Sequence, residues 1–311
     1  GVTRALREFK DRRNGLGAMA SVVQRQFDDL TLEDQLNRGT YVGAVDGWTS
    51  FGPDKLWVLS GWAAATHVTG TQARIFDLQQ SSRHYFQRPD AGHLTLDPDA
   101  TSLSGAGARV WLNKERGKWV SNSGLGFLSP GFDLNDIGFQ SRADIVNAHT
   151  AFGHSWSTPG KFKQFARVNG SLYGSTDFGG NVTSRGAWTG GFVEFQNRYS
   201  LNWWSNYNTQ VTGVRLTRGG PRVKAPPNYE LGGYFDTDGN KQLFYSVQVN
   251  WNGSNDGGHF VNSFPSIEWK PASNVRLSMG PGIVRGIEKA QYVETYPDPA
   301  AAATYGNRYM F

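Results

Sequence analysis

The sequence predicts an all-β protein, and more specifically an antiparallel, up-and-down transmembrane β-barrel with fourteen or more strands. Three observations lead to this prediction. Runs of about ten residues alternate between apolar and polar side chains, as expected for strands that cross a membrane. The apolar face of the clearest runs carries no charge. The connections between runs are alternately short and long, as in a barrel that meanders between two sides of a membrane.

The clearest alternating run lies at residues 242–251. Its apolar face consists of Leu243, Tyr245, Val247, Val249 and Trp251, and its other face is polar except for one phenylalanine. A period of two places alternate side chains on opposite sides of a strand. This run is therefore predicted to face lipid on one side and a polar interior on the other.

The same division recurs in four other runs, at residues 104–112, 146–152, 165–174 and 275–284. None of their apolar faces carries a charge, and a Lys or Arg facing lipid near the midplane would cost about 2–4 kcal/mol. The runs at 55–67 and 183–196 are less clear, because both of their faces are mixed.

Fifteen strands are predicted in all, and no segment shows a capped helical period. They lie near residues 1–10, 15–27, 39–51, 55–67, 101–113, 118–128, 141–156, 161–177, 183–196, 200–213, 228–236, 241–252, 258–270, 274–286 and 304–311. Single-chain bacterial barrels close with an even number of strands. Either one strand is miscounted or the chain is part of a larger barrel, because an open sheet edge cannot face lipid.

The composition agrees with a barrel and narrows the function classes. Hydrophobic residues make up 38 % of the chain, while glycine reaches 39 of 311 residues and tryptophan 11, which disfavours a thick soluble core. A soluble sandwich or propeller would show shorter strands or a repeat of about 40–50 residues. The absence of cysteine excludes disulfides and thiolate chemistry. The net charge of +5 comes from scattered residues, so nucleic acid is not an expected partner.

Four segments of the chain resemble an uncharacterised bacterial outer-membrane β-barrel family. They are SSRHYFQRPDAGHL (81–94), SPGFDLNDIGFQSRAD (129–144), RLTRGGPRV (215–223) and YVETYPDPAAAATYGNRYMF (292–311). In that family the barrel usually follows a periplasmic module similar to family-9 carbohydrate-binding domains, which is absent here. The resemblance covers nearly the whole chain and implies a single barrel domain over residues 1–311 that lacks N- and C-terminal segments. The alternative is that Phe311 is the true end of a complete barrel.

Two long connections hold the candidate ligand contacts. The connection at 68–100 contributes Arg83, Tyr85, Arg88 and Asp90, and the connection at 214–227 is rich in cations and has no acid. Arginine suits bidentate binding of carboxylate or phosphate, and aromatic rings suit sugars. The simpler interpretation is that these side chains contact lipopolysaccharide phosphates or brace the lumen. The candidates of the second connection are Arg215, Arg218 and Arg222.

No residue set predicts catalysis, a cofactor or a metal, so the chain is not expected to be an enzyme. His149 and His154 are five residues apart and fall on opposite faces of a strand. Asp133, Asp136 and Asp144 are expected to bond the backbone of loops rather than to act as a catalytic pair.

The sequence therefore predicts a multi-pass protein of the Gram-negative outer membrane, in contact with lipid and lipopolysaccharide. The first hypothesis is a porin-like pore or transporter-like channel for a small solute, an anion or a glycan fragment. The second is a surface binding or scaffold protein whose barrel is a plugged anchor, with a protein partner at its extracellular loops.

Overall fold

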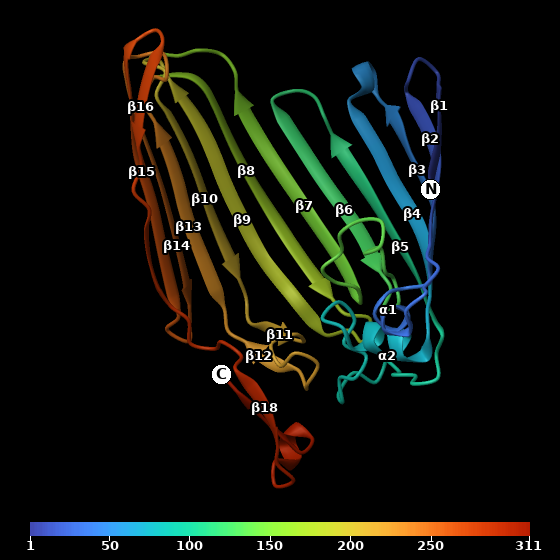
Figure 1. Cartoon of the computed structure of the whole chain (residues 1–311). Helices are drawn as coiled ribbons and strands as arrows, with labels where there is room; N and C mark the ends of the chain where they lie inside the picture. The colour runs from blue at the N-terminus through green and yellow to red at the C-terminus, as the bar shows by residue number, and fades with distance from the viewer.

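The computed structural model describes all residues from Gly1 to Phe311 and consists mainly of one large antiparallel sheet (Figure 1). Fifteen strands belong to it, and neighbours in the sheet follow the order of the chain. The strands of the sheet are β1 (Val2–Phe9), β2 (Asn14–Gln24), β3 (Gly39–Phe51), β4 (Trp57–Thr69), β5 (Ser102–Lys114), β6 (Trp119–Leu128), β7 (Ile145–Trp156), β8 (Lys163–Thr176), β9 (Val182–Phe195), β10 (Ser200–Asn208), β13 (Asn228–Asp236), β14 (Leu243–Ser254), β15 (His259–Ala272), β16 (Val275–Met279) and β17 (Ile283–Ile287). The predicted antiparallel meander is confirmed.

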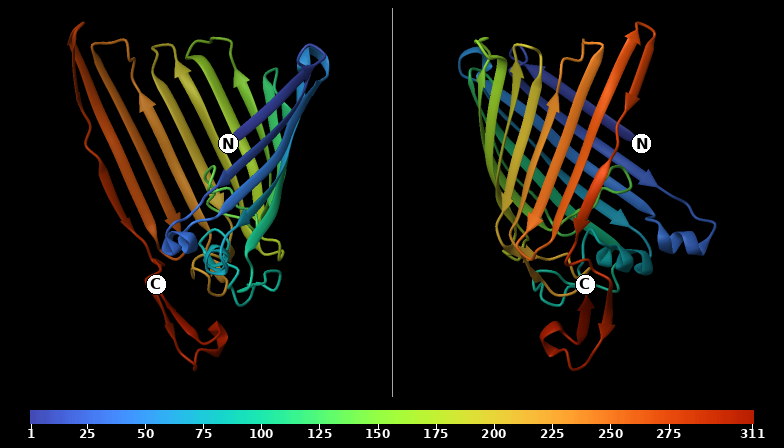
Figure 2. Two further views of the ribbon diagram at one scale, coloured as in Figure 1. Left: turned by 45° about the vertical axis from the view of Figure 1, so that its right-hand side comes forward. Right: turned by 90° about the vertical axis from the view of Figure 1, so that its left-hand side faces the viewer.

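The sheet curves into a trough whose two edges do not meet (Figure 2). β1 forms one edge, while β16 and β17 both pair with β15 and form the other. The sheet is therefore open, and the closed barrel that was expected is not seen.

The predicted alternation of connections is confirmed in part, and the two sets gather at opposite ends of the trough (Figure 1). One end has only short connections, while the other has the long ones and also two short ones at 177–181 and 255–258. The sequence predicts almost no helix, and this is confirmed, because the two α-helices are short and lie in long connections, α1 (Leu30–Gln35) and α2 (Gln72–Gln80). Asp29 and Thr71 cap their N-termini by accepting hydrogen bonds from backbone N–H groups of the first turn. No helix is both long and apolar enough to span a membrane.

Three predicted strands need correction. The strand predicted at 200–213 ends at Asn208, and the chain then leaves the sheet to form a small hairpin of β11 (Val211–Gly213) and β12 (Val223–Ala225). The strand predicted at 274–286 is broken between β16 and β17, because Pro281 has no N–H to donate. The strand predicted at 304–311 is not in the sheet. β19 (Asn307–Met310) pairs with β18 (Glu294–Pro297) in a hairpin that extends beyond the long-loop end (Figure 1).

The two faces of the sheet differ as the sequence predicts. Directly paired residues share a face, so the registers assign every strand side chain to one face or the other. One face carries large apolar side chains that are exposed, namely Leu16, Val45, Leu59, Val110, Leu125, Phe152, Leu172, Leu231, Val249 and Met279. The opposite face is rich in Asn, Ser, Trp and charged residues, and the long loops fold against it. The apolar face is therefore the convex one.

The buried apolar cluster of the protein is small and lies at the long-loop end. Ile75 and Leu78 of α2 pack against Val68 and Leu103 on the concave face of β4 and β5. Beside this cluster the loop at 129–144 lies so close to β5 that a Cβ on Gly105 would stand 2.1 Å from the backbone nitrogen of Phe132. Glycine at this position lets the loop rest directly on the strand.

Candidate functional site

The long connections at residues 70–101, 129–144 and 209–227 meet at one end of the concave face, and we call them the loop cluster. All seven residues predicted as ligand contacts lie in it. They are Arg83, Tyr85, Arg88, Asp90, Arg215, Arg218 and Arg222. The structure shows what each of these side chains contacts within the chain, and most contacts are with the other loops.

Asp133 fastens the 129–144 loop to its neighbours. Its side chain is fully buried and accepts hydrogen bonds from Arg83 Nε at 3.2 Å and from His84 at 3.1 Å. Its backbone N–H donates to Thr66 Oγ1 of β4. Burial alone would raise the pKa of the carboxyl, but bonds from His84 and the Asn135 N–H, with the charges of His84 and Arg83, lower it to about 2. Asp133 is therefore an ionised anchor between loop and sheet.

Asp136 forms a second anchor between this loop and the N-terminal strands. It accepts hydrogen bonds from Arg25 at 2.9 Å, from Asn37 at 2.7 Å and from the hydroxyl of Thr40 on β3. Burial opposes ionisation, but these three donors and the charge of Arg25 lower the pKa of Asp136. Asp133 bonds the nearby backbone N–H of Asn135, as expected of a loop aspartate, whereas the partners of Asp136 are all distant side chains, contrary to that expectation.

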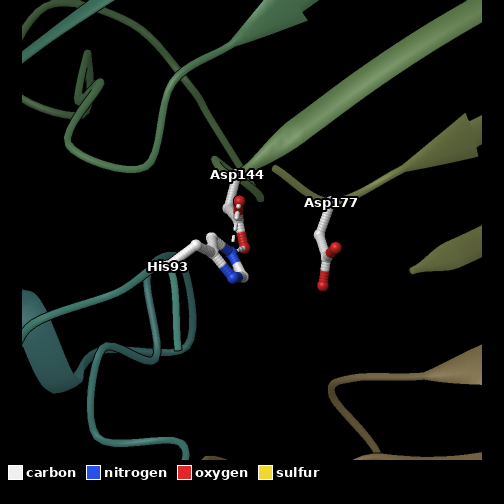
Figure 3. A group of neighbouring side chains, drawn as sticks. All are labelled: His93, Asp144 and Asp177. Atoms are coloured by element: carbon white, nitrogen blue, oxygen red, sulfur yellow. Dashed lines mark hydrogen bonds and ion pairs between the residues drawn. The ribbon is translucent and has the colours of Figure 1, made fainter. Parts of the chain in front are cut away.

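A buried group of charges joins three loops around Arg88. The guanidinium lies 2.9 Å from Asp144 and 3.8 Å from Asp177, and its side chain is only 3 % exposed. His93 Nε2 bonds the same carboxylate of Asp144, as Figure 3 shows. Asp144 takes a left-handed backbone conformation with φ of 53°, which is uncommon outside glycine and is sustained here by these bonds.

His93, Asp144 and Asp177 are also the residues best placed to hold a metal ion, since one ligand atom of each lies within 4.8 Å of the others. The hydrogen-bond donors that already contact Asp144 and Asp177 argue against a metal ion at this place. Arg88 supplies a positive charge between the carboxylates, and the backbone N–H groups of Phe178 and Asn181 occupy further oxygens of Asp144 and Asp177. A divalent cation would have to displace these partners, so the group is better described as an ion-pair network.

The arginines of the loop cluster surround very little free space. Arg83, Arg88, Arg142 and Arg215 line a cavity of about 10 Å³, which has room for roughly one water molecule. Burial lowers the pKa of Arg142 and Arg215, and for Arg142 the neighbouring charge of Arg215 adds to the effect. This part of the cluster is closed, so it does not accept a sugar or phosphate without rearrangement.

Arg215 and Arg218 each stack on an aromatic ring. The guanidinium of Arg215 lies 5.6 Å from the ring centre of Tyr85, and that of Arg218 lies 4.6 Å from the ring centre of Tyr292. The remaining pair, Asp90 and Arg222, has its carboxylate 2.7 Å from the backbone nitrogen of Arg222.

The C-terminal segment lies against the same loops. A Cβ on Gly220 would stand 2.3 Å from the hydroxyl of Tyr309 on β19. Together with the contact between Arg218 and Tyr292, this means that the four sequence segments singled out above meet in space. Sequence reasoning missed His93, Asp177 and Arg142 as parts of this network. His93 and Arg142 lie inside two of the four segments, whereas Asp177 lies outside all of them, and nothing in the sequence indicated that the three share a network.

No curated protein and no solved structure is detectably similar to the chain. Residues 60–305 match a family described as a domain of unknown function, DUF5916. The match includes strands β5 to β17 and all three connections of the loop cluster. Because it covers well over half of the 311 residues, the chain belongs to the uncharacterised DUF5916 family.

Proposed function

We propose that the sheet is the wall of a β-barrel in a bacterial outer membrane, and that the barrel is a pore or channel for small hydrophilic solutes. The division of the sheet into an exposed apolar convex face and a polar concave face carries this proposal. Only 36 of 311 residues are buried, so the apolar side chains of the strands have no core of their own to fill. Lipid on the convex side would give them an apolar environment.

Aromatic pairs mark two levels on the convex face. At the short-turn end Phe51 stacks on Trp57, and at the long-loop end Tyr41 packs against His67. The two levels are ten residues apart along β3, which corresponds to about 33 Å of strand. A strand tilted by about 40° would then span roughly 25 Å, the height of the apolar band in outer-membrane barrels. Such barrels carry an aromatic girdle at each interface.

The open edges of the sheet require partners in a membrane. β1 has an unpaired side, and so does the opposite edge at β16 and β17. Backbone N–H and C=O groups that face lipid without a partner cost several kcal/mol each. We therefore propose that further strands pair with both edges and close the barrel.

The loop cluster would narrow the lumen at its extracellular mouth, since long loops of such barrels lie outside the cell. Its anchors run to β3 and β4 through Thr40 and Thr66. The concave face of β13, β14 and β15 has no such anchor and carries polar side chains, among them Gln248 and Asn250. The proposed path for water and solutes follows these strands.

The second candidate function is a surface binding or scaffold protein with a plugged barrel. The closed packing of the four arginines around about 10 Å³ favours it, because those loops are held inward and leave no opening between them. In this case lipopolysaccharide or a protein partner would contact the outer surface of the loops, where Arg222 is 48 % exposed.

Conductance separates the two functions. Full-length protein that contains this chain would be inserted into planar lipid bilayers and the current recorded under a voltage ramp. The pore function predicts stepwise current increases of uniform size that scale with salt concentration. A folded, membrane-inserted protein that conducts no ions at any voltage would contradict the pore and support the plugged anchor. Unfolded protein of the same preparation is the control for leakage.

A further inference from the structure

The concave face carries a groove outside the loop cluster, at the middle and short-turn end of strands β5 to β9. Its volume is about 520 Å³, within the range of about 300–1,000 Å³ typical of small-molecule sites. The residues that matter for the argument are Asn113, Asn122, Gly153, Arg167, Asn169 and Trp188. By register all six lie on the same polar face of the sheet.

The floor of the groove is low because β7 carries small residues there. Ala151 and Gly153 face the concave side between larger side chains on the neighbouring strands. A Cβ on Gly153 would stand 2.3 Å from Oδ1 of Asn169, so this glycine lets the amide lie across the floor. The depression is therefore built by the residue sizes of one strand.

Trp188 provides a flat wall. Its ring lies over Gly190 two residues along β9, where a Cβ would stand 2.6 Å from the ring. One ring face thus covers the buried glycine, and the other is left to line the groove. The C–H face of a pyranose ring packs well on such an aromatic face, whose π-system attracts polarised hydrogens.

The polar groups of the groove suit a hydroxylated ligand with a negative charge. On one wall the amide nitrogen of Asn122 donates to Asn113 and its oxygen bonds Nε2 of His149, which leaves one N–H of Asn122 and the amide nitrogen of Asn113 to donate to a ligand. Asn169 lies opposite them. Arg167 is exposed and makes no ion pair, in contrast to the arginines of the loop cluster. Lys114 is paired with Trp57 in the register and so lies on the convex face, while Glu115 lines the groove without an ion pair. Arg167 is therefore a cation of the groove that pairs with no carboxylate of the chain.

We propose that this groove is a binding subsite for an acidic sugar, such as a hexuronate unit of an oligosaccharide. The sugar ring stacks on Trp188, the carboxylate pairs with Arg167, and the hydroxyls bond Asn122 and Asn169. The inference deepens the proposed function and rests on it in one respect, namely that the concave face is the lumen of the barrel.

The test measures binding and current separately. Isothermal titration of full-length protein in detergent with a galacturonate trimer is expected to show saturable binding. Arg167→Gln and Trp188→Leu are each expected to weaken that binding by roughly ten- to a hundredfold, because a charge-assisted contact or the stacking surface is lost. The matched control is Trp48→Leu, since Trp48 also lies over a glycine on the concave face but on distant β3. This control is expected to bind the trimer like the parent protein.

Two outcomes would overturn the subsite: no binding of the trimer by folded protein, or equal weakening in the Trp48→Leu control. A neutral maltotriose that binds as tightly as the galacturonate trimer would refute the role of Arg167. Far-ultraviolet circular dichroism checks that each variant is folded. Failure of the subsite and failure of the pore remain distinguishable, because a conducting protein that binds no trimer loses only the subsite. A protein that binds the trimer but conducts no ions would contradict only the pore.

Discussion

The sheet and the loop cluster are stabilised by different interactions, although they share one chain. Of 196 backbone hydrogen bonds, 151 lie within helices and strands, and most of these belong to the large sheet. The loop cluster instead depends on side-chain contacts of buried charged groups such as Arg88, Asp133 and Asp144. The sheet therefore tolerates many substitutions that keep its two faces, whereas the loop cluster depends on a few individual residues.

The largest expected effect comes from breaking the buried network. Arg88→Met should destabilise the loop cluster by about 3–5 kcal/mol, because Asp144 and Asp177 would be left buried without their cation. Hydrogen exchange of the loop amides measures this, since opening of the loops can be local. The control Arg222→Met removes a partly exposed ion pair and should cost less than about 1 kcal/mol. Equal effects of both variants would show that burial of the network is not what matters.

The next largest effect is expected from a charge placed on the convex face of the sheet, compared with the same charge on the concave face. Val249→Arg places a charge on the convex face near the middle of β14, and should lower the free energy of unfolding in lipid vesicles by about 2–4 kcal/mol. Gln248→Arg, one residue away on the concave face, should change it by less than about 1 kcal/mol. Denaturant titration of the vesicle-inserted protein gives both values. Similar losses for the two variants would contradict the assignment of lipid to the convex side.

A smaller effect on the stability of the loop cluster is expected when the pH is lowered. The folded pKa of Asp133 is about 2, below its ordinary value of 3.8, so the anchor contributes its full stability above about pH 4. That contribution, about 2 kcal/mol, is lost as the pH falls through 2, and Asp136 shifts in the same direction. The loops should therefore exchange amide hydrogens faster between pH 4 and 2, before the sheet unfolds. In Asp133→Asn this acceleration should be reduced, and an unchanged pH profile would argue against the anchor.

The smallest expected effect is that of metal ions. Because Arg88 and backbone N–H groups already satisfy Asp144 and Asp177, added Ca²⁺ or Zn²⁺ should leave the exchange of the loop amides unchanged. In Arg88→Met the two carboxylates lose this cation, and a stabilising effect of metal would then be visible. A clear stabilisation of the parent protein by either ion would show that His93, Asp144 and Asp177 form a metal site.

The sheet could be predicted from the sequence because its signal is local. Alternation such as that of Leu243 to Trp251 assigns a face to each residue without knowledge of any partner strand. The break at Pro281 was visible in principle, since a proline between glycines rarely continues a strand. The departure of β11 from the sheet depends on its pairing with β12, a choice that the alternation pattern does not specify.

The loop cluster could be predicted only in part. Its arginines and tyrosine stood out by composition, but their partners lie up to 132 residues away along the chain, as for Asp90 and Arg222. Ion pairs of this kind have no fixed spacing, so Asp177 and Arg142 carried no signal. The groove at Trp188 was equally hidden, because it depends on the register of five neighbouring strands.

The claim that the convex face contacts lipid is tested most directly by a cysteine scan of β14. The chain has no cysteine, so single cysteines can be introduced from residue 243 to 251 and spin-labelled without background. In vesicles, accessibility to oxygen, which concentrates in lipid, should peak at every second position, including 245, 247 and 249. Accessibility to a water-soluble nickel chelate should peak at the positions between them. Equal access of the water-soluble reagent to both sets would contradict a membrane barrel.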